Sequence, residues 1–259
     1  MSGDLLYEVK DGGVAWITFN RPEARNAMTF GMYDRLGELC RELDAERSVR
    51  VLVLRGAGDK AFVAGTDISQ FRGLSTPADA LAYEARLDRV FDALETVRVP
   101  TIAAIQGACT GGGLGLAAAC DLRLATPTAK LGFPIARTLG NTLSMRTHTR
   151  MAALIGVART KEMVFLARLW GAEEMRAAGF LNEVVADADL YARAEELARR
   201  LLEHAPLTLD ATKQALNAVL RHAQPPGGDE LVVRNYLSED FREGMESFLA
   251  KRRPQWKGR

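Results

Sequence analysis

The sequence predicts an α/β fold, and two observations carry this prediction. Short β-branched runs alternate with stretches of helical apolar spacing in the first half of the chain, whereas the second half is mostly helical. No change in composition along the 259 residues, 47% of them hydrophobic, marks a second independent core. Because strands that alternate with helices form one layered core, we expect one alternating core followed by a helical tail.

The first half begins with a hairpin and continues with alternating helices and strands. Asp11-Gly12-Gly13 lies between Leu5–Val9 and Val14–Phe19, which is the pattern of two strands joined by a tight turn. Thr76-Pro77 indicates a helix start, because proline fits the first helical position. We also expect helices over 28–45 and 77–97, and buried strands at Val51–Leu54 and Thr101–Ile105.

The chain after Asp121–Ala125 is expected to be mostly helical. Apolar spacing predicts a helix over Leu190–Leu202, and Pro206 begins another that runs to Arg221. Pro225-Pro226-Gly227-Gly228 then separates it from a last helix over Asp229–Lys251.

Composition argues against several classes of function. A formal net charge of +1 does not favour a nucleic-acid-binding surface, which needs a basic excess on one face. The N-terminus lacks the basic and apolar regions of a signal peptide, so we expect a cytoplasmic protein. Residues 99–120 carry no charge and are long enough to span a bilayer, but Pro100, Gly107 and the triple glycine would break such a helix, so we expect no membrane span.

The three cysteines are expected to be reduced structural thiols. Cys40, Cys109 and Cys120 are odd in number and have neither a metal-binding nor a redox spacing. We therefore expect no metal site.

The end of the chain carries a local excess of basic residues over Glu243 and Glu246. Such a cluster suits a phosphate-bearing ligand, although a solvated helix end explains it equally well. Its members are Arg242, Lys251, Arg252, Arg253, Lys257 and Arg259.

Two glycine-rich segments are the most informative features of the sequence. Gly56–Ile68 follows the first buried strand, and Gly107–Gly115 follows the second and leads into the apolar stretch Leu114–Cys120. Each segment is expected to form a loop whose backbone approaches a ligand closely. Two backbone N–H groups that meet on one ligand oxygen would form an oxyanion hole, which stabilises charge that develops on a carbonyl.

These segments, in this order, resemble the enoyl-CoA hydratase/isomerase (crotonase) superfamily. The resemblance extends to Asn20–Ala27, Cys120–Arg123 and Glu243–Arg252, and so spans nearly the whole chain. It implies a spiral of repeated ββα units over residues 1–200, which holds an acyl-CoA site, and a helical C-terminal region for trimerisation over 201–259. It further implies an acyl-CoA thioester as substrate, with coenzyme A as part of that substrate and no separate cofactor, and a homotrimer or a dimer of trimers.

The resemblance also assigns roles to individual residues. The oxyanion donors would be the backbone N–H groups of Thr66 and Gly112, which follow from their places in the two glycine segments. Asp67 is expected to be mainly structural, as a cap at the start of a helix. The residues expected around coenzyme A are Arg25 near the phosphates, Lys60, Ala61, Ala64, Asp67 and Ile68 along the adenine and pantetheine, and Phe248 and Lys251, which a neighbouring subunit would supply.

The chain departs from the family pattern at both catalytic glutamates of the hydratases. Gly115 and Ile135 occupy those positions, and neither side chain can transfer a proton. No aspartate or glutamate lies between Leu122 and Lys161, so a shift in alignment does not restore the second carboxylate. Arg137, Asn141 and His148 are the candidate replacements, and Gln70, Ser144 and Arg146 are further polar groups for the cleft. A helix cap is the commoner role of a residue like Asn141, and a structural role is the commoner one for His148.

Three functions therefore remain open. The first is an acyl-CoA enzyme that keeps the enolate-stabilising amides but uses other acid–base groups, as an isomerase, decarboxylase, hydrolase or atypical hydratase. The second is a noncatalytic acyl-CoA-binding or scaffold protein. The third is a dinucleotide-binding module, because Gly113–Ala118 fits a relaxed GxGxxA pattern, although no acidic residue follows at a distance of about 20 residues.

Overall fold

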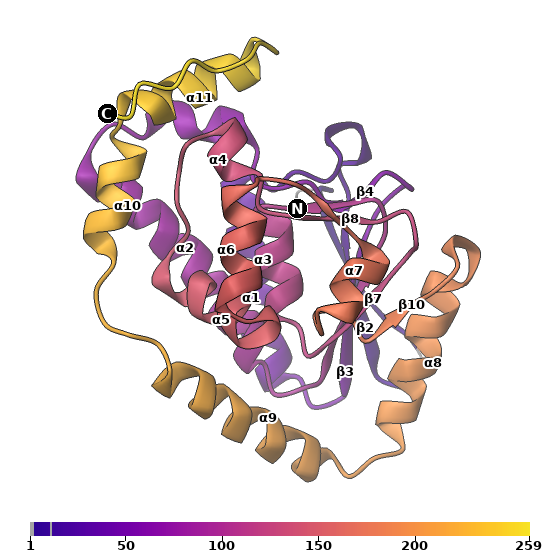
Figure 1. The fold of residues 1–259 in the computed structure, drawn as a ribbon. Coiled ribbons are helices and arrows are strands. Elements are labelled where there is room, and N and C mark those ends of the chain that lie inside the picture. The colour runs from indigo at the N-terminus through magenta and orange to yellow at the C-terminus, as the bar shows by residue number, and fades with distance from the viewer. Residues whose placement is uncertain (1–2, 11) are drawn as a thin grey trace.

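The structure, a computed structural model, describes residues 3–10 and 12–259 and confirms the α/β class (Figure 1). Its strands are β1 (Leu5–Lys10), β2 (Val14–Phe19), β3 (Val51–Gly56), β4 (Ala61–Val63), β5 (Thr101–Ile105), β6 (Ala108–Thr110), β7 (Leu122–Ala125), β8 (Lys130–Gly132), β9 (Trp170–Gly171) and β10 (Glu183–Val184). Its α-helices are α1 (Phe30–Ala45), α2 (Pro77–Thr96), α3 (Gly112–Ala119), α4 (Ile135–Thr138), α5 (Met145–Ile155), α6 (Val157–Phe165), α7 (Ala172–Ala177), α8 (Leu190–Leu202), α9 (Pro206–His222), α10 (Asp229–Tyr236) and α11 (Glu239–Leu249). Short 3-10 helices are η1 (Pro22–Ala24), η2 (Ile68–Gly73) and η3 (Asp187–Asp189).

The strands form two sheets that are built in turn. The larger sheet has the order β1-β2-β3-β5-β7-β10, and the smaller one the order β4-β6-β8-β9. From β3 onward, a strand of the larger sheet is followed by a strand of the smaller sheet and then by helix: β3-β4-α2, β5-β6-α3 and β7-β8-α4. These repeated ββα units confirm the expected spiral.

Each glycine-rich segment contains a short strand, which differs from the expected plain loops. β4 lies within Gly56–Ile68 and β6 within Gly107–Gly115, and the two strands pair in parallel. Runs of three residues are too short to show strand periodicity in a sequence, so only the fold reveals them.

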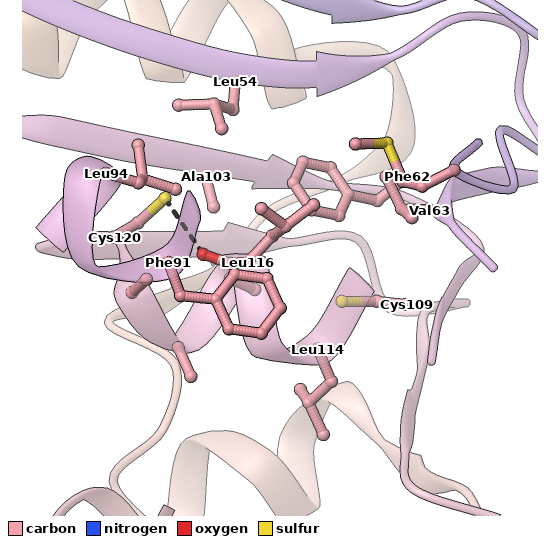
Figure 2. Close-up of a cluster of buried hydrophobic side chains, with 14 of the residues drawn as sticks. Leu54, Phe62, Val63, Phe91, Leu94, Ala103, Cys109, Leu114, Leu116 and Cys120 are labelled. Atoms are coloured by element: carbon pink, nitrogen blue, oxygen red, sulfur yellow. Dashed lines mark hydrogen bonds between the residues drawn. The ribbon is translucent and has the colours of Figure 1, made fainter. Parts of the chain in front are cut away.

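The larger sheet is buried on both faces, which explains its almost unbroken apolar strands. Trp16 and Val53 point to one face, where they pack with Leu190 and Ala194 of α8. The opposite face meets α1, α2 and α3 in the main core. Figure 2 shows this core beside the glycine segments, where Phe91 of α2 lies next to the residues of α3.

The cysteines are free and buried, as expected of structural thiols. Burial raises the pKa of Cys40 and of Cys120 to about 12, so both stay protonated near neutral pH. The thiol of Cys120 donates a hydrogen bond to the Leu116 carbonyl at 3.5 Å (Figure 2).

Most helices agree with the sequence, but the predicted last helix is wrong. Instead of one helix over Asp229–Lys251, the chain forms α10 and α11 with a break at Leu237-Ser238. The Ser238 hydroxyl accepts a hydrogen bond from the Phe241 N–H and so caps α11. The break lets α10 pack against α2 while α11 packs against η2 and α4.

The helical tail leaves the core at α9, which runs along the outer edge of the molecule (Figure 1). In the described part of the chain, no helix is both long and apolar enough to cross a bilayer.

Candidate functional site

The two amides expected to act as oxyanion donors lie close together. A Cβ added to Gly111 would lie 3.6 Å from the Cα of Gly65, and one added to Gly112 would lie 3.3 Å from Oγ1 of Thr66. The glycine segments therefore meet where β4 ends and α3 begins. Gly65 has a φ of 105° and Gly111 a φ of 53°, so both turns use backbone conformations that favour glycine.

Both of these N–H groups are free to bind a ligand. Gly112 is the first residue of α3, where the N–H has no partner in the helix. Around Thr66, the Met28 N–H donates to the Gly65 carbonyl and the Asp67 N–H donates to the Met28 carbonyl, both at 2.8 Å. Within the described residues, neither the Thr66 nor the Gly112 N–H donates a hydrogen bond.

Three hydroxyl groups lie beside these amides, and the sequence patterns did not single out two of them. Oγ1 of Thr66 lies 3.0 Å from the Tyr33 hydroxyl and 2.9 Å from the Tyr83 hydroxyl. We call Tyr33, Thr66 and Tyr83 the hydroxyl triad. Tyr33 comes from α1 and Tyr83 from α2, so helices far apart in the sequence bring them together. Burial raises the pKa of both phenols, so they stay protonated near neutral pH.

The positions of the missing glutamates are filled by apolar groups. A Cβ added to Gly115 would lie 2.7 Å from Cε2 of Phe91, so the ring of Phe91 takes the space next to this residue. Ile135 is buried at the start of α4, within the main core. Neither position offers a group that transfers protons.

The three candidate replacements differ in exposure and in the contacts they make. Arg137 is exposed on α4. Nδ2 of Asn141 donates to the Tyr236 hydroxyl at 3.0 Å, while Ser144, rather than Asn141, caps α5. His148 is half-buried on α5, and burial lowers the pKa of its imidazole. No hydrogen bond in the described chain connects any of these side chains to the hydroxyl triad.

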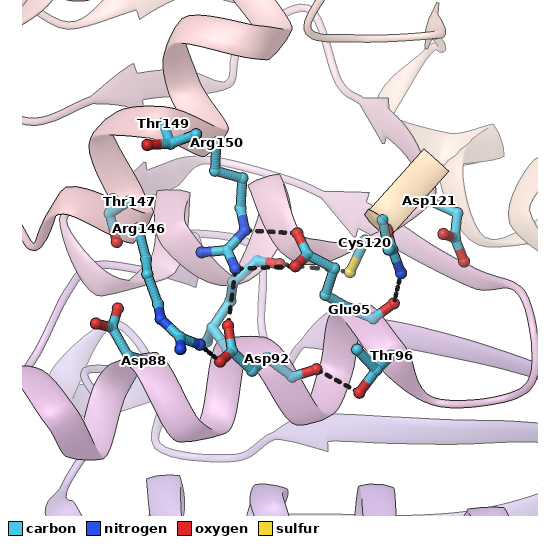
Figure 3. Close-up of polar contacts among 12 residues, drawn as sticks. Asp88, Asp92, Glu95, Thr96, Cys120, Asp121, Arg146, Thr147, Thr149 and Arg150 are labelled. Atoms are coloured by element: carbon cyan, nitrogen blue, oxygen red, sulfur yellow. Dashed lines mark hydrogen bonds and ion pairs between the residues drawn. The ribbon is translucent and has the colours of Figure 1, made fainter. Parts of the chain in front are cut away.

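Arg146, which was proposed for the cleft, instead holds α5 to α2 together with Arg150. Arg150 binds Glu95 through Nε at 2.7 Å, and its Nη2 lies 3.2 Å from Asp92, as Figure 3 shows. Arg146 pairs with the same Asp92 carboxylate.

Ser144 and Gln70 are also occupied. The Ser144 hydroxyl donates to Asp88 at 2.7 Å, and Oε1 of Gln70 accepts from the Phe30 N–H at 3.3 Å.

One buried carboxyl group, that of Glu84, was not among the residues predicted from the sequence. Glu84 follows Tyr83 on α2, and its carboxylate accepts hydrogen bonds from the Tyr236 hydroxyl at 2.5 Å and the Ser144 N–H at 3.1 Å. Burial raises the pKa of Glu84 to about 7. The available signal was an acidic residue within the apolar stripe of α2, which includes Ala80 and Leu87.

The residues expected around coenzyme A follow the first glycine segment. Lys60 lines a hollow of about 270 Å³ together with Gly58, Asp59, Pro22 and Glu23. The other residues differ in exposure: Arg25 is exposed, Ala61 is buried in β4, and Ala64 and Ile68 are half-buried. The Arg25 carbonyl accepts a hydrogen bond from the Ala64 N–H at 3.1 Å, which places Arg25 beside this segment.

Asp67 has the structural role that was expected. Its Oδ1 accepts a hydrogen bond from the Ser69 N–H at 3.1 Å and caps η2, while Oδ2 lies 3.1 Å from the Arg21 guanidinium. Burial acts to raise the pKa of Asp67, but the Ser69 and Arg21 hydrogen bonds outweigh it and lower the pKa.

The C-terminal candidates lie on α11 and just beyond it. The side chain of Phe248 is 50% exposed, and Lys251 is exposed after the end of the helix. α11 packs against η2, which begins at Ile68, so this helix adjoins the first glycine segment.

Ion pairs neutralise half of the C-terminal basic cluster. Arg252 pairs with Glu243 at 2.5 Å, and Lys257 and Arg259 pair with Glu239. The pKa of Glu243 falls to about 2, mainly through its bond from Arg252. Arg242, Lys251 and Arg253 form no ion pair within the described residues.

The dinucleotide hypothesis is wrong. In that motif the first glycine forms the tight turn before the helix, whereas Gly113, which would be the first glycine here, lies inside α3 and is buried. A Cβ on Gly113 would overlap the Val63 carbonyl, so this glycine permits close packing of α3 on β4.

Comparison with known proteins agrees with this fold and arrangement. The family model described as enoyl-CoA hydratase/isomerase matches residues 9–259. The short-chain-enoyl-CoA hydratase of Clostridium acetobutylicum is 32% identical over 247 residues, which cover 94% of each chain. The chain therefore belongs to the enoyl-CoA hydratase/isomerase family.

Solved structures give the same result. An enoyl-CoA hydratase/carnithine racemase from Magnetospirillum magneticum has a TM-score of 0.80 at 33% identity, covering 100% of this chain and 97% of that one. A methylmalonyl-CoA decarboxylase in complex with 2-nitronate-propionyl-CoA has a TM-score of 0.89 at 27% identity, over 100% of both chains. The expectation of an enzyme of the hydratase/isomerase type is thus confirmed, and acyl-CoA processing is supported as its class of reaction.

Proposed function

We propose that this protein binds an acyl-CoA thioester and stabilises its enolate with the N–H groups of Thr66 and Gly112. The observation that carries the proposal is that two adjacent backbone donors are free, while the carbonyls around them are already paired. Donors fixed in the backbone need no reorganisation when negative charge develops on the thioester oxygen. Coenzyme A is then part of the substrate, and the reaction needs no separate cofactor.

The proposed reaction is a lyase or isomerase step other than standard two-glutamate hydration. Hydration by that route needs two titratable groups that hold water, and the corresponding residues are Gly115, covered by Phe91, and the buried Ile135. Decarboxylation, double-bond isomerisation or an atypical hydration all proceed through an enolate and remain compatible with the free amides.

Coenzyme A is proposed to lie along the first glycine segment. Lys60 and the hollow beside it would take the adenosine end, and Arg25 would contact the phosphates. Phe248 and Lys251 would complete the site from a neighbouring subunit of a homotrimer or of a dimer of trimers.

The surface of α9 supports such an assembly. Leu207, Leu216 and Val219 are 80%, 64% and 66% exposed, which is unusual for three apolar side chains on one helix. We propose that residues 201–259 form the trimerisation region and residues 1–200 the spiral core. Light scattering should give a trimer or hexamer, and a change of Leu216 to Glu should lower the mass; a monomeric wild type would contradict this assignment.

The test of the function is a mass-spectrometric screen with enoyl-, β-keto- and malonyl-type CoA esters. Gly112→Pro removes the N–H at a helix position that tolerates proline. An added Cβ at this residue would overlap the Tyr33 hydroxyl, so Gly112→Ala is the matched control that adds the Cβ but keeps the N–H. We expect the proline variant to lose about 10²–10³-fold in kcat relative to the alanine variant.

Each remaining outcome of the screen is informative. Equal and measurable kcat in the two Gly112 variants would contradict the role of this amide. Hydration of crotonyl-CoA at rates typical of hydratases would contradict the conclusion drawn from Gly115 and Ile135. Binding of CoA esters without any turnover would instead support the noncatalytic acyl-CoA-binding protein, which the two missing glutamates favour.

A further inference from the structure

The hydroxyl triad has more O–H protons than it has hydrogen bonds to hold them. Each hydroxyl carries one proton, so Tyr33, Thr66 and Tyr83 together carry three. The triad forms two hydrogen bonds, Tyr33–Thr66 and Thr66–Tyr83, and no described residue outside it bonds to any of these hydroxyls. One O–H proton is therefore left without an acceptor in a buried place, which is costly unless a ligand accepts it.

The triad also lies directly against the proposed oxyanion donors. Thr66 belongs to both groups, because its N–H is one donor and its hydroxyl is the centre of the triad. The Tyr33 hydroxyl fills the space where a Cβ of Gly112 would lie, so a phenol contacts the residue that carries the second donor. Tyr33 and Tyr83 are almost fully buried, whereas Gly112 is half-buried at the edge of this region.

The side chains around the triad are mostly aromatic. Tyr83 packs against Phe30, Phe71 and Tyr236, with ring centroids 5.8, 4.9 and 5.7 Å away. The carboxyl group of Glu84, which follows Tyr83, is held by Tyr236 and Ser144 rather than by the triad. The triad is therefore a neutral proton source in an apolar setting.

We propose that the hydroxyl triad supplies the proton that a thioester enolate needs, with Tyr33 as the catalytic acid. This inference rests on the proposed function and names the group that replaces the missing glutamates in that reaction. Tyr33 is assigned the final transfer because its hydroxyl is the one that lies against Gly112. A phenol that stays protonated near neutral pH is suited to donate a proton rather than to remove one.

Every proton and electron pair in the proposed step has a source and a destination. The electron pair of the enolate forms a C–H bond at the α carbon with the Tyr33 proton, the Tyr33 O–H bond breaks, and the carbonyl of the thioester forms again. The Thr66 hydroxyl then gives its proton to the Tyr33 phenolate and takes one from Tyr83. Solvent water returns the proton to Tyr83.

Tyr33→Phe tests the proposal, with methylmalonyl-CoA and crotonyl-CoA as probes in D₂O. Each reaction places one deuterium at the α carbon, and an acid held on one face gives a single stereoisomer. We expect wild type to give one stereoisomer from the probe it turns over. In Tyr33→Phe we expect kcat to fall by about 10²-fold with little change in KM, and the remaining product to be a stereoisomer mixture.

Two further variants distinguish the roles of Thr66 and Tyr83 from that of Tyr33. Thr66→Val keeps the backbone N–H but removes the hydroxyl, so we expect a smaller loss of kcat, on the order of 10-fold. Tyr83→Phe should have the smallest effect, because Tyr33 still carries its proton. Tyr7→Phe, which changes a phenol on β1, should leave turnover unchanged and serves as the matched control, with circular dichroism to confirm folding of every variant.

Failure of this inference differs from failure of the proposed function. An active wild type whose rate and stereochemistry persist in Tyr33→Phe would overturn the role of Tyr33 alone. A larger loss in Tyr83→Phe than in Tyr33→Phe would overturn the order of the transfer. A wild type that turns over neither probe nor any other ester in the screen would overturn both the catalytic function and the inference.

Discussion

The two halves of α2 carry polar groups of different kinds into the interior. The first half presents Tyr83 and Glu84, which bond to hydroxyl and amide groups. The second half presents Asp92 and Glu95, which bind the guanidinium groups of α5 (Figure 3). In the first half a donor proton is left over, whereas in the second half the carboxylates are paired with cations. A buried group with a free donor suits a ligand site, and a paired one suits a structural site.

The largest loss of stability is expected when the ion pairs in the second half of α2 are removed. Arg150→Met leaves the buried carboxylate of Glu95 without its cation, while Asp92 keeps its pair with Arg146, so we expect the free energy of unfolding to fall by about 3–5 kcal/mol. Arg35→Met removes an exposed ion pair with Glu42 and should cost no more than about 1 kcal/mol. Urea unfolding of both variants measures the difference, and equal losses would show that the buried network has no special weight.

The next largest effect is a dependence of stability on pH through Glu84. The pKa of Glu84 is about 7 in the folded protein, raised from 4.5 chiefly by burial, so the folded state binds more protons than the unfolded state between these values. Stability from this group is therefore full below pH 4.5 and falls as the pH rises to 7. Relative to Glu84→Gln, wild type should lose on the order of 3 kcal/mol across this range.

Urea unfolding of wild type and Glu84→Gln at pH 5 and pH 8 checks this prediction. The stability of wild type minus that of the variant should be lower at pH 8. A difference that stays constant would mean that Glu84 is ionised at both pH values in the folded state.

A smaller effect is expected at Phe91, which lies in α2 between Glu84 and Asp92. Gly115→Ala brings a methyl group within 2.7 Å of the ring, and we expect a net loss of about 1–2 kcal/mol, because overpacking exceeds the gain in helix propensity. In a Phe91→Leu background the same change should be neutral or stabilising. A double-mutant cycle measured by thermal unfolding gives the coupling, and additive effects would contradict the contact.

The smallest effect concerns the start of α2, outside both networks. The Thr76 hydroxyl accepts from the Asp79 N–H at 3.2 Å, and the Asp79 carboxylate accepts from the Thr76 N–H at 2.9 Å, which forms a capping box. Thr76→Ala should cost about 1 kcal/mol without changing turnover. A loss of activity larger than the loss of stability explains would connect this helix end to the site.

The sequence predicted more of the backbone of the site than of its side chains. The two glycine segments place Thr66 and Gly112 by local pattern and family resemblance, and the structure leaves their N–H groups free. Sequence position alone points to Arg137, Asn141 and His148, because they lie near a missing glutamate in the sequence. Sequence position does not point to Tyr33, because an aromatic residue within the apolar pattern of a helix is usually a core residue.

Sequence alone determined the α/β class, the hairpin and the bounds of α8, because these depend on spacing and turn chemistry within a few residues of one another. It also established that Gly115 and Ile135 cannot transfer protons. Tertiary structure decided the smaller sheet, the break between α10 and α11, the contact of Phe91 with Gly115 and the assembly of the hydroxyl triad. These features join residues from separate elements, so they depend on how helices and strands pack, which local periodicity does not encode.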